Sequence, residues 1–357
     1  MAKVRKKISF KGKKIYVGID VHKKQWTICI CTEHTNYRPF SMEPDPQILI
    51  NYLKKNFPGG QYTCAYEAGF SGFVLYEALW ESFIECLVIH PADIPTSHKE
   101  TQFKTDSRDA LKIAKSLRAG QLQSIHIPDK LLQQERSLVR TRQQLTADLV
   151  RYKCRVKSLL AFYNISIPEQ FQKANWNNDM RGWLWDLEFP CDIGAKSIRF
   201  LMSMLEYTRA MRLNIDTHLG ELARSTRYEQ QVELLTSVCG FATIRAIKFL
   251  VEIGDIKRFP NMDKLACFVG LVPASSNSGN KVIQKELTVR GHKHLRTMLI
   301  EAAWVAIGTD PAMAHKYAQL KKRMLAQQAI VAVARSLLAR IRFVLINKVK
   351  YQKGIIN

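Results

Sequence analysis

The sequence predicts an α/β domain at the N-terminus, then a long helical linker and a mainly α-helical C-terminal domain. Runs of β-branched and aromatic residues alternate with helical patterns in the first 127 residues. The stretch 131–163 contains neither Pro nor Gly, which is typical of one long helix. Helical patterns recur from residue 194 to residue 346. The expected domains are 1–127, a coiled-coil linker at 128–228, and 229–357.

The order of elements in the first domain is specific. Strands are expected at 16–21, 26–31, 37–40, 62–66 and 86–89, and helices at 46–57, at 72–83 and through Asp106 and Asp109. A basic arm, Met1 to Lys14, precedes them. Three strands, helix, strand, helix, strand and helix is the order of a ribonuclease-H-like domain.

The remaining chain predicts a second long helix at 194–227, which returns alongside the first. An irregular, Trp-containing segment at 168–190 separates the two helices. Residues 234–254 predict a helix–turn–helix pair with Gly240 at the turn, where backbone amides can approach a phosphate. A polar loop at 273–280 follows, and helices are expected at 292–307 and 328–346.

The charge balance points to a polyanionic partner. Lys and Arg number 54 against 31 acidic residues, so the net charge is +23. An excess of this size favours nucleic acid. A generically basic ribosomal-type protein or a membrane-surface protein is the alternative interpretation of composition alone.

No stretch of the sequence approaches the ~18 uninterrupted apolar residues that a membrane span needs. The basic N-terminal arm lacks the apolar core of a signal peptide. The eight cysteines are scattered without a CxxC pair, so neither a zinc ribbon nor a disulfide framework is indicated. We therefore expect a cytoplasmic protein with no membrane partner.

Four carboxylates carry the predicted chemistry. Asp20 lies within the first strand, Glu67 closes a neighbouring strand, and Asp106 and Asp109 project from one helix face. A carboxylate in a sheet core needs a partner, either the basic run His22-Lys23-Lys24 or a metal ion. Four gathered carboxylates would repel one another, and two Mg²⁺ ions about 4 Å apart would relieve that repulsion. Structural ion pairs are the alternative.

Six motifs carry a resemblance to a known family: GIDVHKK, AYEAG, KTDSRDA, LTSVCGFATIRAIKFLVEIGDIKRF, KLACFVGLVPASSNSG and RGHKHLR. In this order they resemble the DEDD transposases of the insertion-sequence 110 family, which are bridge-RNA-guided serine recombinases. The resemblance implies a RuvC-like N-terminal domain and a C-terminal transposase domain. It also implies donor and target DNA, a structured noncoding guide (bridge) RNA, Mg²⁺, and a homo-oligomer, either a dimer or a tetramer. The expected place of action is the nucleoid of a bacterial or archaeal cell.

Carried over residue by residue, the resemblance assigns the catalytic, metal-binding tetrad to Asp20, Glu67, Asp106 and Asp109, and the nucleophile to Ser278. Further basic or small residues near these motifs or on the long helix are expected to contact nucleic acid. They are Lys104, Arg108, Arg140, Arg151, Lys153, Arg155, Gly279, Lys281 and Arg296.

The predicted activity is RNA-guided, site-specific DNA recombination through a phosphoserine intermediate, with Ser278 of one subunit meeting the metal site of another. One alternative is a metal-dependent, RuvC-like nuclease or Holliday junction resolvase, in which water replaces the serine. The other alternative is a nucleic-acid-binding protein without chemistry. The first predicts strand nicking that survives Ser278→Ala, and the second predicts binding that Mg²⁺ leaves unchanged.

Overall fold

A computed structural model describes residues 9–95, 105–172, 176–278, 281–287 and 291–354, with the backbone path alone for 274–278 and 281–287. The chain forms two compact units, residues 1–127 and residues 128–357. The helical pair expected as a linker therefore belongs to the same unit as the C-terminal elements.

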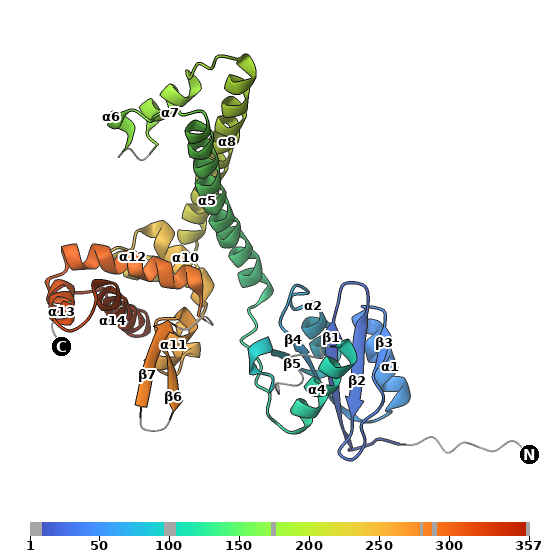
Figure 1. The fold of residues 1–357 in the computed structure, drawn as a ribbon. Coiled ribbons are helices and arrows are strands. Elements are labelled where there is room, and N and C mark those ends of the chain that lie inside the picture. Colours follow the sequence, from blue (N-terminus) through green and yellow to red (C-terminus); the bar gives the residue numbers. More distant parts are fainter. Residues whose placement is uncertain (1–8, 96–104, 173–175, 279–280, 288–290, 355–357) are drawn as a thin grey trace, which may run out of the picture. The chain divides into compact units, whose positions relative to one another are not determined.

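The first unit is built on a five-stranded sheet with strand order β3-β2-β1-β4-β5 (Figure 1). The strands are β1 (Lys14–Val21), β2 (Trp26–Cys31), β3 (Phe40–Met42), β4 (Gln61–Glu67) and β5 (Glu85–Ile89). Strands β1, β2 and β3 pair in antiparallel fashion, whereas β4 lies parallel to both β1 and β5. Since β1 is central, its residues are covered on both faces.

Helices cover both faces of this sheet. Their bounds are α1 (Pro46–Asn56), α2 (Val74–Glu81) and α4 (Asp106–Arg118), with a 3₁₀ turn at Pro91–Asp93. Helix α1 begins where Asp45 accepts a hydrogen bond from the amide of Gln47 and where Pro46 occupies the first helical position. The predicted order of strands and helices is confirmed, with strand and helix ends shifted by up to three residues.

Successive residues of β1 point to opposite faces of the sheet and therefore belong to different hydrophobic clusters. Ile15, Val17 and Ile19 are fully buried and pack with α1 and α2. The intervening residues Tyr16, Gly18 and Asp20 face the side that α4 covers, as the two-residue period of a strand requires. Cys29 and Cys31 are buried against α4, as expected of small apolar side chains.

Two long helices, α5 (Lys130–Phe162) and α8 (Asp192–Ala223), pack side by side in the second unit (Figure 1). Asp129 begins α5 by accepting a hydrogen bond from the amide of Leu132. Arg142 of α5 forms an ion pair with Asp216 of α8, which fixes the antiparallel register of the pair.

The segment between these helices was predicted to be irregular, and that prediction is wrong in part. It contains α6 (Glu169–Gln172) and α7 (Asn178–Trp185), and Asn177 begins α7 by accepting a hydrogen bond from the amide of Met180. Trp176, Trp183 and Trp185 pack around a small core that includes Leu160, Phe171 and Ile198.

The C-terminal helices share one large core. They are α9 (Glu229–Thr236), α10 (Thr243–Ile253), α11 (Met262–Val269), α12 (Lys293–Thr309), α13 (Pro311–Lys321) and α14 (Ala326–Asn347), with a 3₁₀ turn at Ile256–Arg258. Helix α13 was not predicted, although Asp310 and Pro311 are a helix-start signal and Asp310 accepts from the amide of Ala312.

The segment expected to be a polar loop is part of a β-hairpin, formed by β6 (Pro273–Ser278) and β7 (Lys281–Leu287). The Ser and Asn content of β6 favours a turn, but β7 contains Val282 and Ile283, and cross-strand pairing overrides the local preference of β6. Within the described ranges, none of the helices combines the length and the apolarity that crossing a membrane requires.

Candidate functional site

Strand register places two of the predicted carboxylates at one level of the sheet. Ile19 of β1 is the register partner of Tyr66 of β4, so Asp20 and Glu67 are the next residues along two adjacent parallel strands. The carboxyl ends of parallel strands meet at one edge of a sheet, where ligands usually bind. Both side chains are half-buried there.

Gly18 allows α4 to approach this part of the sheet. A Cβ atom on Gly18 would lie 2.2 Å from the carbonyl oxygen of Ala110 and 2.5 Å from the amide nitrogen of Ala114. Only a residue without a side chain fits, so the first turns of α4 lie directly over β1. That first turn contains Asp106 and Asp109. Acidic residues in the first turn of a helix also interact favourably with the helix dipole, so Asp106 and Asp109 stabilise α4 as well.

Three of the ligand-type side chains converge. Asp20, His22 and Asp106 each offer one ligand atom, and these atoms all lie within 4.8 Å of one another. Nε2 of His22 lies 3.2 Å from Oδ2 of Asp20 and 3.7 Å from Oδ1 of Asp106. His22 thus bridges a carboxylate of the sheet and a carboxylate of the helix.

Electrostatics within the cluster favour the binding of a cation. Burial raises the pKa of Asp20; His22 opposes that shift, while the negative charges of Asp106 and Asp109 add to it. A carboxylate that other carboxylates destabilise gains from a divalent cation, which neutralises the repulsion. Asp109 is therefore close enough to interact with Asp20, although it does not belong to the three-residue group.

The donor set fits a divalent cation. Carboxylate oxygens are the ligands that Mg²⁺ prefers, and an imidazole nitrogen also suits Mn²⁺ and other transition metals. Asp20 and Asp106 would hold the cation from the sheet and from the helix. Glu67 stands at the same level as Asp20 on the adjacent strand β4, and His22 would either join the ligands or turn aside.

The hairpin that contains Ser278 is held at its base. A Cβ atom on Gly291 would lie 2.1 Å from the Cα atom of Gly270, and Gly270 has a φ of 82°. The amide of His292 donates a hydrogen bond of 2.8 Å to the carbonyl oxygen of Phe268. The two chain segments that lead into and out of the hairpin therefore touch. Ser278 pairs in register with Lys281, and its side chain lies outside the described residues.

Comparisons with known proteins identify both ends of the chain. Residues 17–165 match the transposase model for DEDD transposases of IS110. Residues 232–318 match the transposase family of IS116, IS110 and IS902. Both parts of the chain are therefore similar to transposases of the IS110 family. The first match contains all four predicted carboxylates, and the second contains Ser278 and its hairpin.

Individual relatives agree with this assignment. The chain is 30% identical over 68% of its length to protein y4qE of Sinorhizobium fredii, provisionally named a transposase, and spans 58% of that relative's own length. It is 26% identical over 82% of its length to the transposase for insertion sequence element IS1533 of Leptospira borgpetersenii, of which it covers 85%. It is 23% identical over 56% of its length to the transposase for element IS1111A of Coxiella burnetii, of which it covers 54%.

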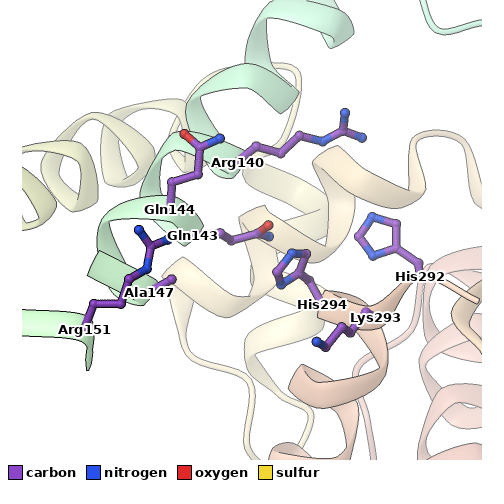
Figure 2. A pocket seen from close by; sticks show the side chains of 8 residues that line it. All are labelled: Arg140, Gln143, Gln144, Ala147, Arg151, His292, Lys293 and His294. Carbon is purple, nitrogen blue, oxygen red and sulfur yellow. The ribbon is translucent and has the colours of Figure 1, made fainter. Parts of the chain in front are cut away.

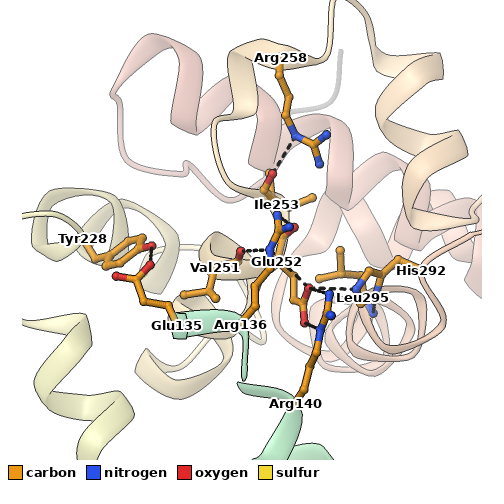
Figure 3. A network of polar contacts seen from close by, with 10 residues as sticks. All are labelled: Glu135, Arg136, Arg140, Tyr228, Val251, Glu252, Ile253, Arg258, His292 and Leu295. Carbon is orange, nitrogen blue, oxygen red and sulfur yellow. Dashed lines mark hydrogen bonds and ion pairs between the residues drawn. The ribbon is translucent and has the colours of Figure 1, made fainter. Parts of the chain in front are cut away.

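Several arginines of the long helix have structural partners (Figure 3). Arg136 donates hydrogen bonds of 3.0 Å and 2.9 Å to the carbonyl oxygens of Val251 and Glu252, at the C-terminal end of α10. Arg140 donates two hydrogen bonds of 3.2 Å to the carboxylate of Glu252. These contacts join α5 to α10, so the basic face of α5 is not uniformly open to solvent.

The other residues predicted to contact nucleic acid are distributed unevenly. Arg108 and Arg151 are exposed, Lys153 lies 5.5 Å from the ring centre of Trp176, and Arg155 lies 5.3 Å from that of Tyr152. Arg296 is half-buried and donates to the carbonyl oxygen of Gly270, which connects it with the hairpin base. Lys104, Gly279 and the side chain of Lys281 lie outside the described residues.

His22 is the site residue that sequence reasoning did not assign. The sequence contained a signal, because His22 follows Asp20 by two residues and a strand places such residues on one side. His22 was grouped with Lys23 and Lys24 as a possible ion-pair partner of Asp20. Its contact with Asp106 depends on the seating of α4, which no local pattern reveals.

Proposed function

We propose that this transposase cuts and rejoins the DNA of an insertion sequence through a covalent bond between Ser278 and a DNA phosphate, with Mg²⁺ held by Asp20, Glu67, Asp106 and Asp109. The convergence of Asp20, His22 and Asp106 within 4.8 Å supports the cation site most directly. Similarity to DEDD transposases supports the reaction class.

In the proposed reaction the oxygen of Ser278 attacks a backbone phosphorus. A serine–phosphate bond forms and the bond from phosphorus to the 3′ oxygen breaks. The serine proton passes to the departing 3′ oxygen, which leaves as a 3′ hydroxyl. The reverse attack by a 3′ hydroxyl on the serine phosphodiester rejoins DNA and restores the serine. Bound Mg²⁺ would stabilise negative charge on the phosphate oxygens and favour ionisation of an attacking hydroxyl.

The chain's own carboxylates have a further role before DNA binds. Asp20 is half-buried and interacts unfavourably with Asp106 and Asp109, whereas His22 interacts favourably with it. We propose that His22 holds the two aspartates together in the absence of a cation and moves aside when a cation binds. The acidic cluster is then already arranged when the phosphate arrives, which lowers the cost of assembling it.

The proposed reaction needs residues that belong to different compact units, since the acidic cluster belongs to 1–127 and Ser278 belongs to 128–357. We propose that Ser278 of one subunit meets the acidic cluster of another in a dimer or tetramer. On α8, Ile193, Phe200 and Tyr207 recur every seven residues and are 65%, 73% and 63% exposed. An exposed apolar heptad stripe supports pairing between copies of the helix.

RNA guidance is also proposed. Its support is the net charge of +23, which remains after all 31 acidic residues are counted, together with the family resemblance. The structured noncoding RNA would select the donor and target DNA by base pairing, so that the protein supplies backbone contacts and chemistry. The basic residues predicted on α5 and near the hairpin would then be shared between RNA and DNA.

A denaturing gel tests the proposed reaction. The protein is incubated with Mg²⁺, the noncoding RNA of its own insertion sequence and end-labelled donor DNA. A slowly migrating protein–DNA adduct is expected, and it should disappear with Ser278→Ala and, separately, with Asp20→Asn. Cleaved DNA without an adduct, unaffected by Ser278→Ala, would show instead that water is the nucleophile.

Mixing two inactive proteins tests the arrangement of subunits. Ser278→Ala protein retains the acidic cluster, and Asp20→Asn protein retains the serine. If the site forms between subunits, a mixture should regain adduct formation in part, with the adduct on the Asp20→Asn chain. Adduct formation that remains absent at every mixing ratio, while each variant still co-assembles, would contradict the arrangement in trans.

A further inference from the structure

A pocket of about 460 Å³ lies in the second unit, between α5 and the start of α12 (Figure 2). Arg140, Gln143, Gln144 and Arg151 line it from α5, together with Ala147, and His292, Lys293 and His294 line it from the other side. Among the described residues that line the pocket there are three permanent cations, two imidazoles and two amides, and no carboxylate. This set of donors fits an anion.

A buried carboxylate orients one wall of the pocket (Figure 3). The side chain of Glu252 is 2% exposed, and it accepts two hydrogen bonds from Arg140, whose own side chain is 57% exposed. The guanidinium is therefore fixed on its inner side and open on its outer side. An arginine held in this way loses little further freedom when it binds a phosphate.

The second wall is built on the N-terminal end of α12. His292 accepts a hydrogen bond from the amide of Leu295 through Nδ1, and its Nε2 lies 3.2 Å from the carboxylate of Glu252. These two contacts require the tautomer in which Nε2 donates. The imidazole thus begins the helix and ties it to the same buried carboxylate that holds Arg140.

The charges at this helix end oppose ordinary helix stability. Lys293 is the first residue of α12 and His294 is the second, and the first turn contains no acidic residue. The helix dipole disfavours cations at this end and favours anions. The sequence therefore places a cation, Lys293, where it destabilises the unliganded helix, and an anionic ligand would remove the conflict.

The residues from α5 form a stripe rather than a single point. Arg140, Gln143, Gln144, Ala147 and Arg151 follow the spacing of one helical face. The stripe is about 16 Å long at 1.5 Å per residue, several times the ~3.4 Å axial spacing of phosphates along one strand of a duplex. A linear polyanion matches this shape better than one small anion.

The pocket adjoins the hairpin that contains Ser278. Gly291, which ends the hairpin and touches Gly270, is followed at once by His292 and Lys293 of the pocket. A nucleic-acid strand bound at the start of α12 would lie beside the base of the hairpin.

We propose that this pocket binds the phosphodiester backbone of a nucleic acid, with Arg140, Arg151 and Lys293 contacting phosphates and Gln143 and Gln144 contacting phosphate or sugar oxygens. The proposal rests on the proposed function only in that nucleic acid is the ligand. RNA and DNA share the backbone chemistry, and the experiment below separates them.

Equilibrium binding in EDTA tests the pocket without any cleavage. Fluorescence anisotropy is measured with labelled duplex DNA and with labelled RNA, using the full chain and the variants Lys293→Glu and Gln144→Glu. Both side chains are exposed, so folding should survive, and thermal melting checks it. The matched control is Lys316→Glu, the same charge change at an exposed position of α13 that does not line the pocket.

Lys293→Glu is expected to weaken binding about tenfold or more and to reduce the salt slope of log Kd by about 1. Gln144→Glu should weaken binding in the same direction, and Lys316→Glu should change Kd by less than about threefold. If Lys293→Glu weakens the binding of RNA alone, of DNA alone or of both, the result identifies which nucleic acid occupies the pocket. Equal effects of Lys293→Glu and Lys316→Glu, or no effect of Lys293→Glu on either ligand, would overturn the proposal.

The binding result is independent of the serine chemistry. Adduct formation is scored in a separate reaction with Mg²⁺, so pocket-dependent binding without any adduct would count against the serine mechanism alone. An adduct that forms normally while Lys293→Glu binds both nucleic acids like the unchanged chain would count against the pocket alone.

Discussion

Gly18 of β1 and Ala110 of α4 approach so closely that a Cβ atom on Gly18 would lie 2.2 Å from the carbonyl oxygen of Ala110. This contact sets the height of α4 above the sheet. It therefore determines whether Asp106, at the start of α4, reaches His22 and Asp20, at the end of β1. A backbone contact without ligand atoms thus controls the geometry of the candidate metal centre.

Substitution Gly18→Ala should disturb the fold and the cation site together. The added methyl group would have to displace backbone, and overpacking of this kind costs about 1–3 kcal/mol of the free energy of unfolding. Titration with Mn²⁺ should show weaker binding, because α4 moves away from β1.

The matched control for this substitution is Gly220→Ala. Gly220 lies in α8, and a Cβ atom added there would have no neighbouring atom within 4 Å. The change should therefore be neutral or stabilising by up to ~1 kcal/mol. Unchanged Mn²⁺ affinity in Gly18→Ala would refute the link between the backbone contact and the cation site.

Asp20→Asn should abolish activity and yet stabilise the cation-free fold. The pKa of Asp20 is raised in the folded state, mainly by burial, so the folded state disfavours its charge. The destabilisation is present at neutral pH and disappears as the pH falls through the raised pKa. In EDTA at neutral pH, Asp20→Asn should therefore melt at a higher temperature than the unchanged chain. A lower melting temperature would mean that the contact with His22 outweighs burial.

The affinity for a cation should depend on the ionisation of the same carboxyl group, that of Asp20. A proton and a cation compete for the carboxylate of Asp20, so Mn²⁺ affinity should fall on acidification, beginning at a higher pH than an ordinary aspartate would allow. Calorimetric titration with Mn²⁺ at a series of pH values measures this directly. Affinity that is constant down to the ordinary range of an exposed aspartate would exclude Asp20 as a ligand.

Local patterns were sufficient to predict the first unit. The runs of β-branched and aromatic residues and the helical patterns between them are readable over a few residues, and the element order followed from them. The sequence could not reveal which side chains α4 would meet. The contact between His22 and Asp106 depends on Gly18. Glycine is needed at this position because α4 packs against β1, and the local sequence does not show that packing.

The second unit was less predictable for a related reason. The Ser- and Asn-rich segment of β6 has the composition of a turn, and its strand exists through pairing with β7. The arginines of α5 look alike in sequence, but Arg136 is occupied by the end of α10, whereas Arg140 is bound to Glu252 on one side and stays 57% exposed. A count of charges cannot separate an arginine that holds a helix end from one that is open to a phosphate.

Acid should unfold the second unit partly through Glu252. Burial alone would raise the pKa of this carboxyl, but hydrogen bonds from His292 and Arg140 outweigh it and lower the pKa to about 2 from 4.5. Because folding lowers the pKa of Glu252, its carboxylate stabilises the fold at any pH above its unfolded pKa of 4.5. This stabilisation is lost as the pH falls toward the folded pKa of about 2. The difference between the unfolded and folded pKa values of Glu252 corresponds to about 3 kcal/mol of the free energy of unfolding. Glu252→Gln should thus be destabilising at pH 7, with a difference that shrinks below pH ~4.

The control for this prediction is Glu221→Gln, at a side chain that is 59% exposed. Urea titrations at several pH values should show a small, nearly constant effect for the control. A pH-independent deficit in Glu252→Gln would mean that packing, rather than charge, accounts for the loss.

Gly291→Ala should separate adduct formation from cation binding. A Cβ atom at this position would lie 2.1 Å from the Cα atom of Gly270, so the base of the hairpin must open. Adduct formation through Ser278 should fall by about a hundredfold, as a misplacement of roughly 1 Å can cause. Mn²⁺ binding by the acidic cluster, which belongs to the other unit, should stay unchanged. Gly308→Ala in α12, where an added Cβ would meet nothing within 4 Å, serves as the control and should form the adduct normally. A Gly291→Ala chain that forms the adduct at the unchanged rate would show that the seating of the hairpin base does not position the serine.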